Sequence, residues 1–129
     1  MTSRILIALA GLMGAGGVIL AAVAAHIAPG SGLDSAAYML SFHAVAVLAA
    51  VALLQQGRLW RPLAIIALAG FVLGGVLFSG DIALHALAGH RMFPMAAPTG
   101  GTIMIVAWLV LAVAAITGPR RSLNADIAS

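Results

Sequence analysis

The stretch at residues 63–89, LAIIALAGFVLGGVLFSGDIALHALAG, decides the fold of this chain. Apart from Ser79, Asp81 and His85, every residue in it is apolar or small. A helix of this length rises roughly 40 Å at 1.5 Å per residue, which exceeds the ~30 Å hydrocarbon core of a bilayer. The stretch therefore predicts a membrane-spanning helix. A carboxylate inside such a helix is costly unless it is paired or faces a polar cavity, so Asp81 is a candidate functional residue.

Three other segments are also long and apolar enough to cross a bilayer, which takes about 20 residues. The four predicted spans are residues 5–25, 36–54, 63–88 and 99–117. Pro, Gly, Gln and Arg cluster between them, as expected for loops. We therefore expect an all-α, integral membrane four-helix bundle that forms one domain, residues 1–121, followed by a short polar tail at 122–129.

The composition supports a membrane protein. Hydrophobic residues make up 64% of the chain and charged residues only 7%, whereas soluble domains average roughly 25% charged residues. The net charge of +3 invites a nucleic-acid partner, but the chain has no Lys and its six Arg lie where apolar runs end. We therefore expect the lipid bilayer as partner and no nucleic acid. The absence of Cys excludes disulfides, thiolate metal sites and cysteine catalysis.

A cleavable signal peptide is the competing interpretation of the first apolar segment. Arg4 supplies a basic start, and Ala22-Val23-Ala24 resembles a cleavage site. The uncharged stretch between Arg4 and His26 is nevertheless longer than the usual apolar region of about 7–15 residues. We therefore interpret it as a span.

The arginines predict the direction of the spans. With four spans, the N-terminus, the second loop and the C-terminus lie on one side of the membrane, and the third loop, with Arg91, lies on the other. Positive charge concentrates on the cytoplasmic side, so both termini are predicted to be cytoplasmic. Trp60 then falls at the inner interface and Tyr38 at the outer one. The arginines on the cytoplasmic side are Arg4, Arg58, Arg61, Arg120 and Arg121.

Small residues recur at helical spacing in the first and third spans. They include Gly14 and Gly17 in the first and Gly70-x-x-x-Gly74 in the third. Small residues let membrane helices approach closely. They could form a dimerisation face, but packing within the bundle is the favoured interpretation.

Most polar side chains of the spans fall in the outer half of the bilayer under this topology. By helical rise, His43 and Asp81 lie roughly 12 Å below the outer surface and His85 about 6 Å below it. Asp81 and His85 are four residues apart and so share a helix face. The candidate polar cluster is His26, His43, Ser79, Asp81 and His85, with Thr102 on the same side.

Each member of this cluster also has a purely structural interpretation. His26 would lie at the interface, His43 would form an interhelical hydrogen bond, and Asp81 with His85 would form a local pair. Interhelical hydrogen bonds in membranes contribute only about 0.6–2 kcal/mol, so they imply no chemistry. His90 and Arg91 are predicted to be solvated loop residues.

Three functional interpretations of the polar cluster remain open. A divalent metal could be held by His26, His43, Asp81 and His85, since imidazole and carboxylate ligands suit zinc or a related ion. Haem would need two axial histidines across a wide bundle, and a proton or solute path would need polar groups in the inner half as well. The sequence itself requires no cofactor.

A set of motifs in chain order resembles a known family. The third span reads Phe78-Ser79-Gly80, a loop then ends in Pro98-Thr99-Gly100-Gly101, and the fourth span carries Trp108. With His26, Tyr38 and His43, this series resembles the small bacterial membrane proteins of domain-of-unknown-function family 423, relatives of eukaryotic transmembrane protein 256. The resemblance implies a four-span inner-membrane protein of unestablished biochemistry and no catalytic residues. Asp81, His85 and His90 depart from the family pattern.

The sequence contains no recognisable catalytic constellation. A Gly-rich run at residues 11–17 lies inside a span, so it lacks the strand–loop–helix context of a nucleotide site. We therefore expect a non-enzymatic structural or accessory protein of the bacterial inner membrane, with a homo-oligomer or a larger membrane complex as its setting. The alternative is a protein that binds a metal or small ligand at a polar site open to the outer, periplasmic face.

Overall fold

The computed structural model describes residues 1–119 and contains four long α-helices in this range. Each is long and apolar enough to cross a membrane, which confirms the all-α fold with four spans. Their bounds lie within three residues of the predicted ones. The helices are α1 (Thr2–His26), α2 (Leu33–Gln55), α3 (Arg61–Ala88) and α4 (Ala96–Ile116). The predicted tail and Arg120 and Arg121 lie outside the described residues.

The helix ends follow local backbone chemistry. Gly89 ends α3 in the left-handed region, with φ 75°, and donates its N–H to the His85 carbonyl oxygen, which is a common way to end a helix. Pro98, which is expected in the loop before α4, lies inside the first turn of this helix. The first N–H groups of a helix have no intrahelical acceptor, so a proline is tolerated there.

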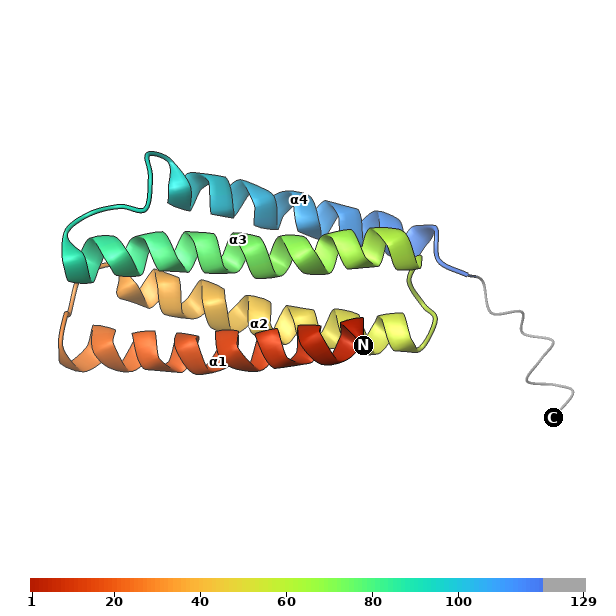
Figure 1. Cartoon of the computed structure of the whole chain (residues 1–129), viewed down its shortest axis with the longest axis horizontal. Coiled ribbons are helices and arrows are strands. Elements are labelled where there is room, and N and C mark those ends of the chain that lie inside the picture. Colours follow the sequence, from red (N-terminus) through yellow and green to blue (C-terminus); the bar gives the residue numbers. More distant parts are fainter. Residues whose placement is uncertain (120–129) are drawn as a thin grey trace, which may run out of the picture.

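The helices pack against their neighbours in chain order. α1 packs on α2, α2 on α3, and α3 on α4, while α1 makes only a minor contact with α3. Figure 1 shows the resulting antiparallel arrangement, in which α1 begins and α4 ends at the same end of the bundle. Large, fully buried side chains of the two helices pack at the α2–α3 interface, namely Val47, Val51, Leu68 and Phe71.

Glycines set the closest approaches between helices. A Cβ on Gly17 of α1 would collide with the Ser41 side chain of α2, and a Cβ on Gly100 of α4 would lie 2.6 Å from the Phe78 nitrogen of α3. Gly74 faces Gly100 across that same interface, where a Cβ would lie 2.8 Å from the Gly100 oxygen. These contacts confirm that small residues pack the bundle itself. Gly11 of α1 is the exception, because a Cβ there would meet nothing within 4 Å.

Candidate functional site

Asp81 is fully buried on α3 and is bound by the loop between α3 and α4. Its Oδ2 accepts a hydrogen bond from Arg91 Nη1 at 3.1 Å, and its Oδ1 accepts one from the Met92 backbone nitrogen at 2.9 Å. The Met92 side chain sits beside Gly80, since a Cβ on this glycine would come within 3.1 Å of the Met92 Cε. Both carboxylate oxygens are therefore engaged, and the loop is fastened to the helix by a charge-assisted contact.

The predicted pairing of Asp81 with His85 is wrong. Within residues 1–119 Asp81 forms its ion pair with Arg91, and His85 is exposed. The two residues are close enough along α3 to pair, but the loop supplies donors to both oxygens of the Asp81 carboxylate. Arg91, predicted to be solvated, is instead half exposed and bound to the carboxylate.

His43 is buried on α2, and both of its ring nitrogens are in use. Nδ1 lies 2.8 Å from the Met39 carbonyl oxygen, and Nε2 accepts a hydrogen bond from Trp108 Nε1 of α4 at 3.3 Å. A carbonyl oxygen requires a donor and the indole N–H requires an acceptor, so this geometry assigns the neutral imidazole with its proton on Nδ1. The Trp108 contact is the interhelical hydrogen bond that was predicted for His43.

The other members of the predicted polar cluster are separate from these two. Ser79 is buried on α3 and donates its hydroxyl to the Ala36 carbonyl oxygen of α2 at 2.9 Å. His26 is exposed at the end of α1, and Thr102 is exposed and donates to the Pro98 carbonyl oxygen. The structure therefore forms three local polar contacts, each between different elements, rather than one cluster.

The predicted metal set, His26, His43, Asp81 and His85, is not assembled. Among residues 1–119, no group of three or more His, Asp or Glu side chains is placed to hold a metal ion. His43 would have to give up a hydrogen bond to become a ligand, and the Asp81 carboxylate already accepts two hydrogen bonds from the loop.

A groove between α2 and α4 is the site that the sequence did not predict. It has a volume of about 390 Å³. Its lining includes His43 of α2, Trp108 of α4 and Phe78 of α3. Tyr38, His43, Phe78, Gly101 and Trp108 carry the family resemblance, and all five line this groove together with Met39, Phe42, Met104 and Ile105.

The spacing of Tyr38 and Phe42 was the available signal for this groove. Two aromatic residues four apart lie on one helix face, and their rings stack with centroids 5.9 Å apart. The ring centroids of Phe42 and Trp108 lie 6.0 Å apart, which is a contact between helices far apart in sequence. The pair of Tyr38 and Phe42 could thus be predicted from the sequence, whereas their neighbour on α4, Trp108, could not.

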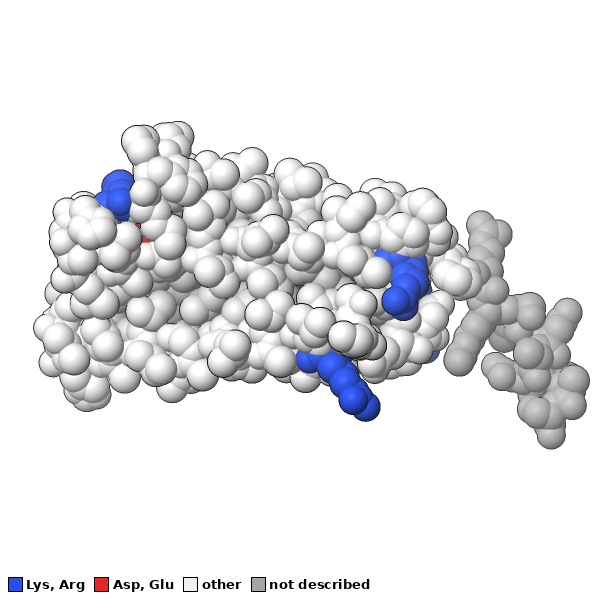
Figure 2. Space-filling view, in the orientation of Figure 1, with Lys and Arg blue, Asp and Glu red and all other residues white. Residues whose placement is uncertain are grey.

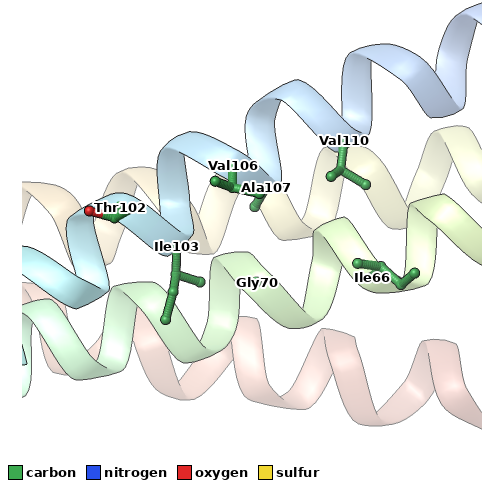
Figure 3. A pocket seen from close by; sticks show the side chains of 7 residues that line it. All are labelled: Ile66, Gly70, Thr102, Ile103, Val106, Ala107 and Val110. Atoms are coloured by element: carbon green, nitrogen blue, oxygen red, sulfur yellow. The ribbon is translucent and has the colours of Figure 1, made fainter.

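A second hollow, between α3 and α4, is mainly aliphatic. It has a volume of about 240 Å³ and includes Ile66, Ile103 and Val106 among its lining residues. Figure 3 shows Thr102 at its edge as the polar side chain among those labelled, and its hydroxyl is already bonded to Pro98. This hollow offers no ring surface and no free donor to a ligand.

Charge is distributed toward the two ends of the molecule. Figure 2 shows arginines toward both ends of the bundle, with a wide uncharged surface between them on this face. Arg4, Arg58 and Arg61 are all exposed, whereas Arg91 is paired with Asp81. A long uncharged flank between charged ends matches the cross-section of a bilayer.

The fold and this charge distribution define a small multi-pass integral membrane protein. A family model described as "Protein of unknown function (DUF423)" matches residues 20–101. The chain is 30% identical over 132 residues to the UPF0382 inner membrane protein YgdD of Escherichia coli K12, covering 96% of this chain and 98% of the relative. The proteins of the same name from E. coli O157:H7 and Shigella flexneri match at the same identity and coverage.

The chain therefore belongs to the DUF423 family, which confirms the resemblance drawn from the motifs. No solved structure matches the chain. The E. coli relative is by name an inner membrane protein, and the four apolar helices fit that location. The protein is a multi-pass inner-membrane protein of unestablished biochemistry.

Proposed function

We propose that this protein is a non-enzymatic accessory protein that acts by packing against other helices in the inner membrane. The observation that carries this proposal is that every buried side-chain nitrogen and oxygen in the described part of the chain has an intramolecular hydrogen-bond partner. The buried polar side chains His43, Ser79 and Asp81 hold helices and a loop in place. Hydrogen bonds of this kind are the contacts expected of a protein that works through packing.

The exposed flanks of the outer helices support the same proposal. In α1 and α4, only 22% of the residues in the most apolar stretch are buried within the chain. Gly11 lies on the uncovered flank of α1, where a side chain would meet open space. Small residues on an uncovered helix face permit close approach by another helix.

Purification in native lipid discs tests this accessory role. The particle mass, after subtraction of lipid, is expected to exceed the 12.9 kDa of one chain, because a second copy or another subunit is retained. Gly11→Leu should reduce the retained mass without unfolding the bundle. Ala49→Leu, at an exposed position on α2, is the matched control. A lipid-solvated monomer alone, for the unmodified chain, would contradict the proposal.

A second candidate function, ligand binding, is favoured by the α2–α4 groove. Binding of a metal is less well supported, because the ring nitrogens of His43 and the carboxylate of Asp81 already take part in hydrogen bonds. The small-molecule form is supported by a hollow whose volume falls in the range of about 300–1,000 Å³ that is usual for ligand sites.

A further inference from the structure

The aromatic residues of this chain gather at one place. The chain has one Tyr, two Trp and four Phe. All of them except Trp60 and Phe93 line the α2–α4 groove or pack directly beneath it, where Phe71 lies 4.7 Å from Trp108 between ring centroids. Four of these rings line the groove itself, whereas the hollow between α3 and α4 is lined by none.

Three of the rings that line the groove are exposed. Tyr38 is 64% exposed, Phe42 45% and Trp108 40%. Aromatic pairs in offset or tilted arrangements contribute about 0.5–1.5 kcal/mol beyond the area they bury. A flat ring entering the groove would gain such contacts from several side chains, whereas a saturated acyl chain would not.

The polar groups of the groove suit a neutral ligand. Its lining contains no Arg, Lys, Asp or Glu, so nothing there would neutralise a phosphate or a carboxylate. The Tyr38 hydroxyl forms no hydrogen bond to any residue from 1 to 119 and can donate to a carbonyl oxygen. The other two polar side chains of the lining, Trp108 and His43, are bonded to each other at 3.3 Å.

Gly101 keeps part of the groove empty. A Cβ at Gly100, the preceding residue, would collide with the α3 backbone, but a Cβ at Gly101 would lie 3.9 Å from the nearest atom, Phe78 Cδ2. Helix packing therefore requires a glycine at position 100 and not at position 101. The missing side chain at Gly101 leaves the edge of the Phe78 ring accessible.

We propose that the α2–α4 groove binds the ring of a prenylated quinone taken from the surrounding membrane. A quinone is neutral and flat, carries carbonyl oxygens that accept hydrogen bonds, and reaches the groove laterally through its prenyl chain. The volume of about 390 Å³ accommodates the ring and the start of the chain. This inference rests on the second candidate function, ligand binding, and not on the accessory role.

Tryptophan fluorescence tests the proposal, because quinones quench indole emission on contact. In lipid discs, the Trp60→Phe protein retains only Trp108, and the Trp108→Phe protein retains only Trp60. Titration with a short-chain ubiquinone, expressed as its mole fraction in lipid, is expected to quench Trp108 saturably. Trp60 should show only the linear quenching of random collision. Equal linear quenching of both tryptophans would overturn the proposal.

Variants of the groove, made in the Trp60→Phe background, locate the site. Gly101→Leu fills the space beside Phe78 and is expected to weaken saturable binding at least tenfold, whereas Gly11→Leu on the outer flank of α1 should leave it unchanged. Tyr38→Phe removes only the hydroxyl and should weaken binding several-fold. A Gly101→Leu protein that folds and binds as the parent does would contradict the site.

Competition separates recognition of the ring from occupation by lipid. A prenol with the same tail but no ring should fail to displace the quinone, and a phospholipid with brominated acyl chains should quench Trp108 no more than Trp60. Displacement by the prenol, or selective quenching of Trp108 by the brominated lipid, would show a hydrocarbon-binding groove and overturn the proposal. These measurements do not use particle mass, so their outcome does not depend on whether the accessory role is correct.

Discussion

Asp81 shows how a single buried charge can be held in an apolar helix. Its carboxylate is fully buried, yet it receives a guanidinium and a backbone N–H from a loop that lies ten and eleven residues further along the chain. The cost of burying a charge is offset only when such partners satisfy its lone pairs. Arg91 and Asp81 together fasten the loop between α3 and α4 to α3.

Removal of Arg91 is expected to destabilise the bundle. Arg91→Ala leaves the Asp81 carboxylate with one donor, and breaking a buried pair on one side costs about 3–5 kcal/mol. Since the Arg91 side chain is half exposed, water compensates in part, and we expect roughly 2–3 kcal/mol. The double variant Asp81→Ser with Arg91→Ala removes both charges and should recover most of the loss.

Thermal unfolding in detergent, followed by circular dichroism, measures both variants. Arg61→Ala is the matched control, because Arg61 is exposed at the opposite end of the bundle. A melting temperature for Arg91→Ala equal to that of Arg61→Ala would show that the ion pair contributes nothing to stability.

The importance of Asp81 could be predicted from its own neighbourhood, but its partner could not. Helical periodicity relates residues three or four apart, and it pointed to His85. The path of a loop has no period, so nothing in the sequence placed Arg91 and Met92 over the carboxylate. The same limit applies to His43, whose burial and interhelical bond were predicted while its partner, Trp108, depends on where α4 packs.

At the scale of the elements, α3 and α4 touch through their backbones. Gly74 and Gly100 face each other where a Cβ on either would come within 3.0 Å of the opposing helix. The run lengths of apolar residues predicted the four helices and their bounds, because span length is fixed by bilayer thickness. Which glycine lies at a contact depends on the rotation of each helix about its axis, and the all-round apolar surface of these helices does not specify that rotation.

The two adjacent glycines of α4 should respond oppositely to alanine. Gly100→Ala places a methyl group against the α3 backbone, and overpacking of this kind costs about 1–3 kcal/mol. Gly101→Ala meets only ordinary contact distance and should be neutral or stabilising by up to about 1 kcal/mol, since alanine favours the helix. Thermal unfolding of the two variants side by side provides the measurement. Equal melting temperatures would contradict the close approach at Gly100.

At the scale of the whole molecule, charge separates the two ends. Arg4, Arg58 and Arg61 are exposed at the end where α1 begins and α3 starts, and Asp34 and the Arg91–Asp81 pair lie at the other end. Membrane proteins orient with the end that carries more Lys and Arg toward the cytoplasm.

We therefore predict that the N-terminus and the end of α4 face the cytoplasm. A fluorescent protein fused after the last residue should fold and fluoresce, and alkaline phosphatase at the same point should be inactive. Alkaline phosphatase inserted at Gly30, in the loop between α1 and α2, should be active. The opposite pattern would reverse the topology and place the mouth of the α2–α4 groove in the inner leaflet.

The packing of each helix on its predecessor has a consequence for biogenesis. The chain leaves the ribosome from its N-terminus. α2 packs against α1, α3 packs against α2, and α4 packs against α3. Each newly inserted helix thus meets a helix that is already in the bilayer. α4 completes the bundle when Trp108 forms its hydrogen bond with His43. Contacts between neighbours in sequence form quickly because little chain entropy is lost. Assembly can therefore proceed during translation, one helix at a time, and the finished chain needs no later exchange of partners within the membrane.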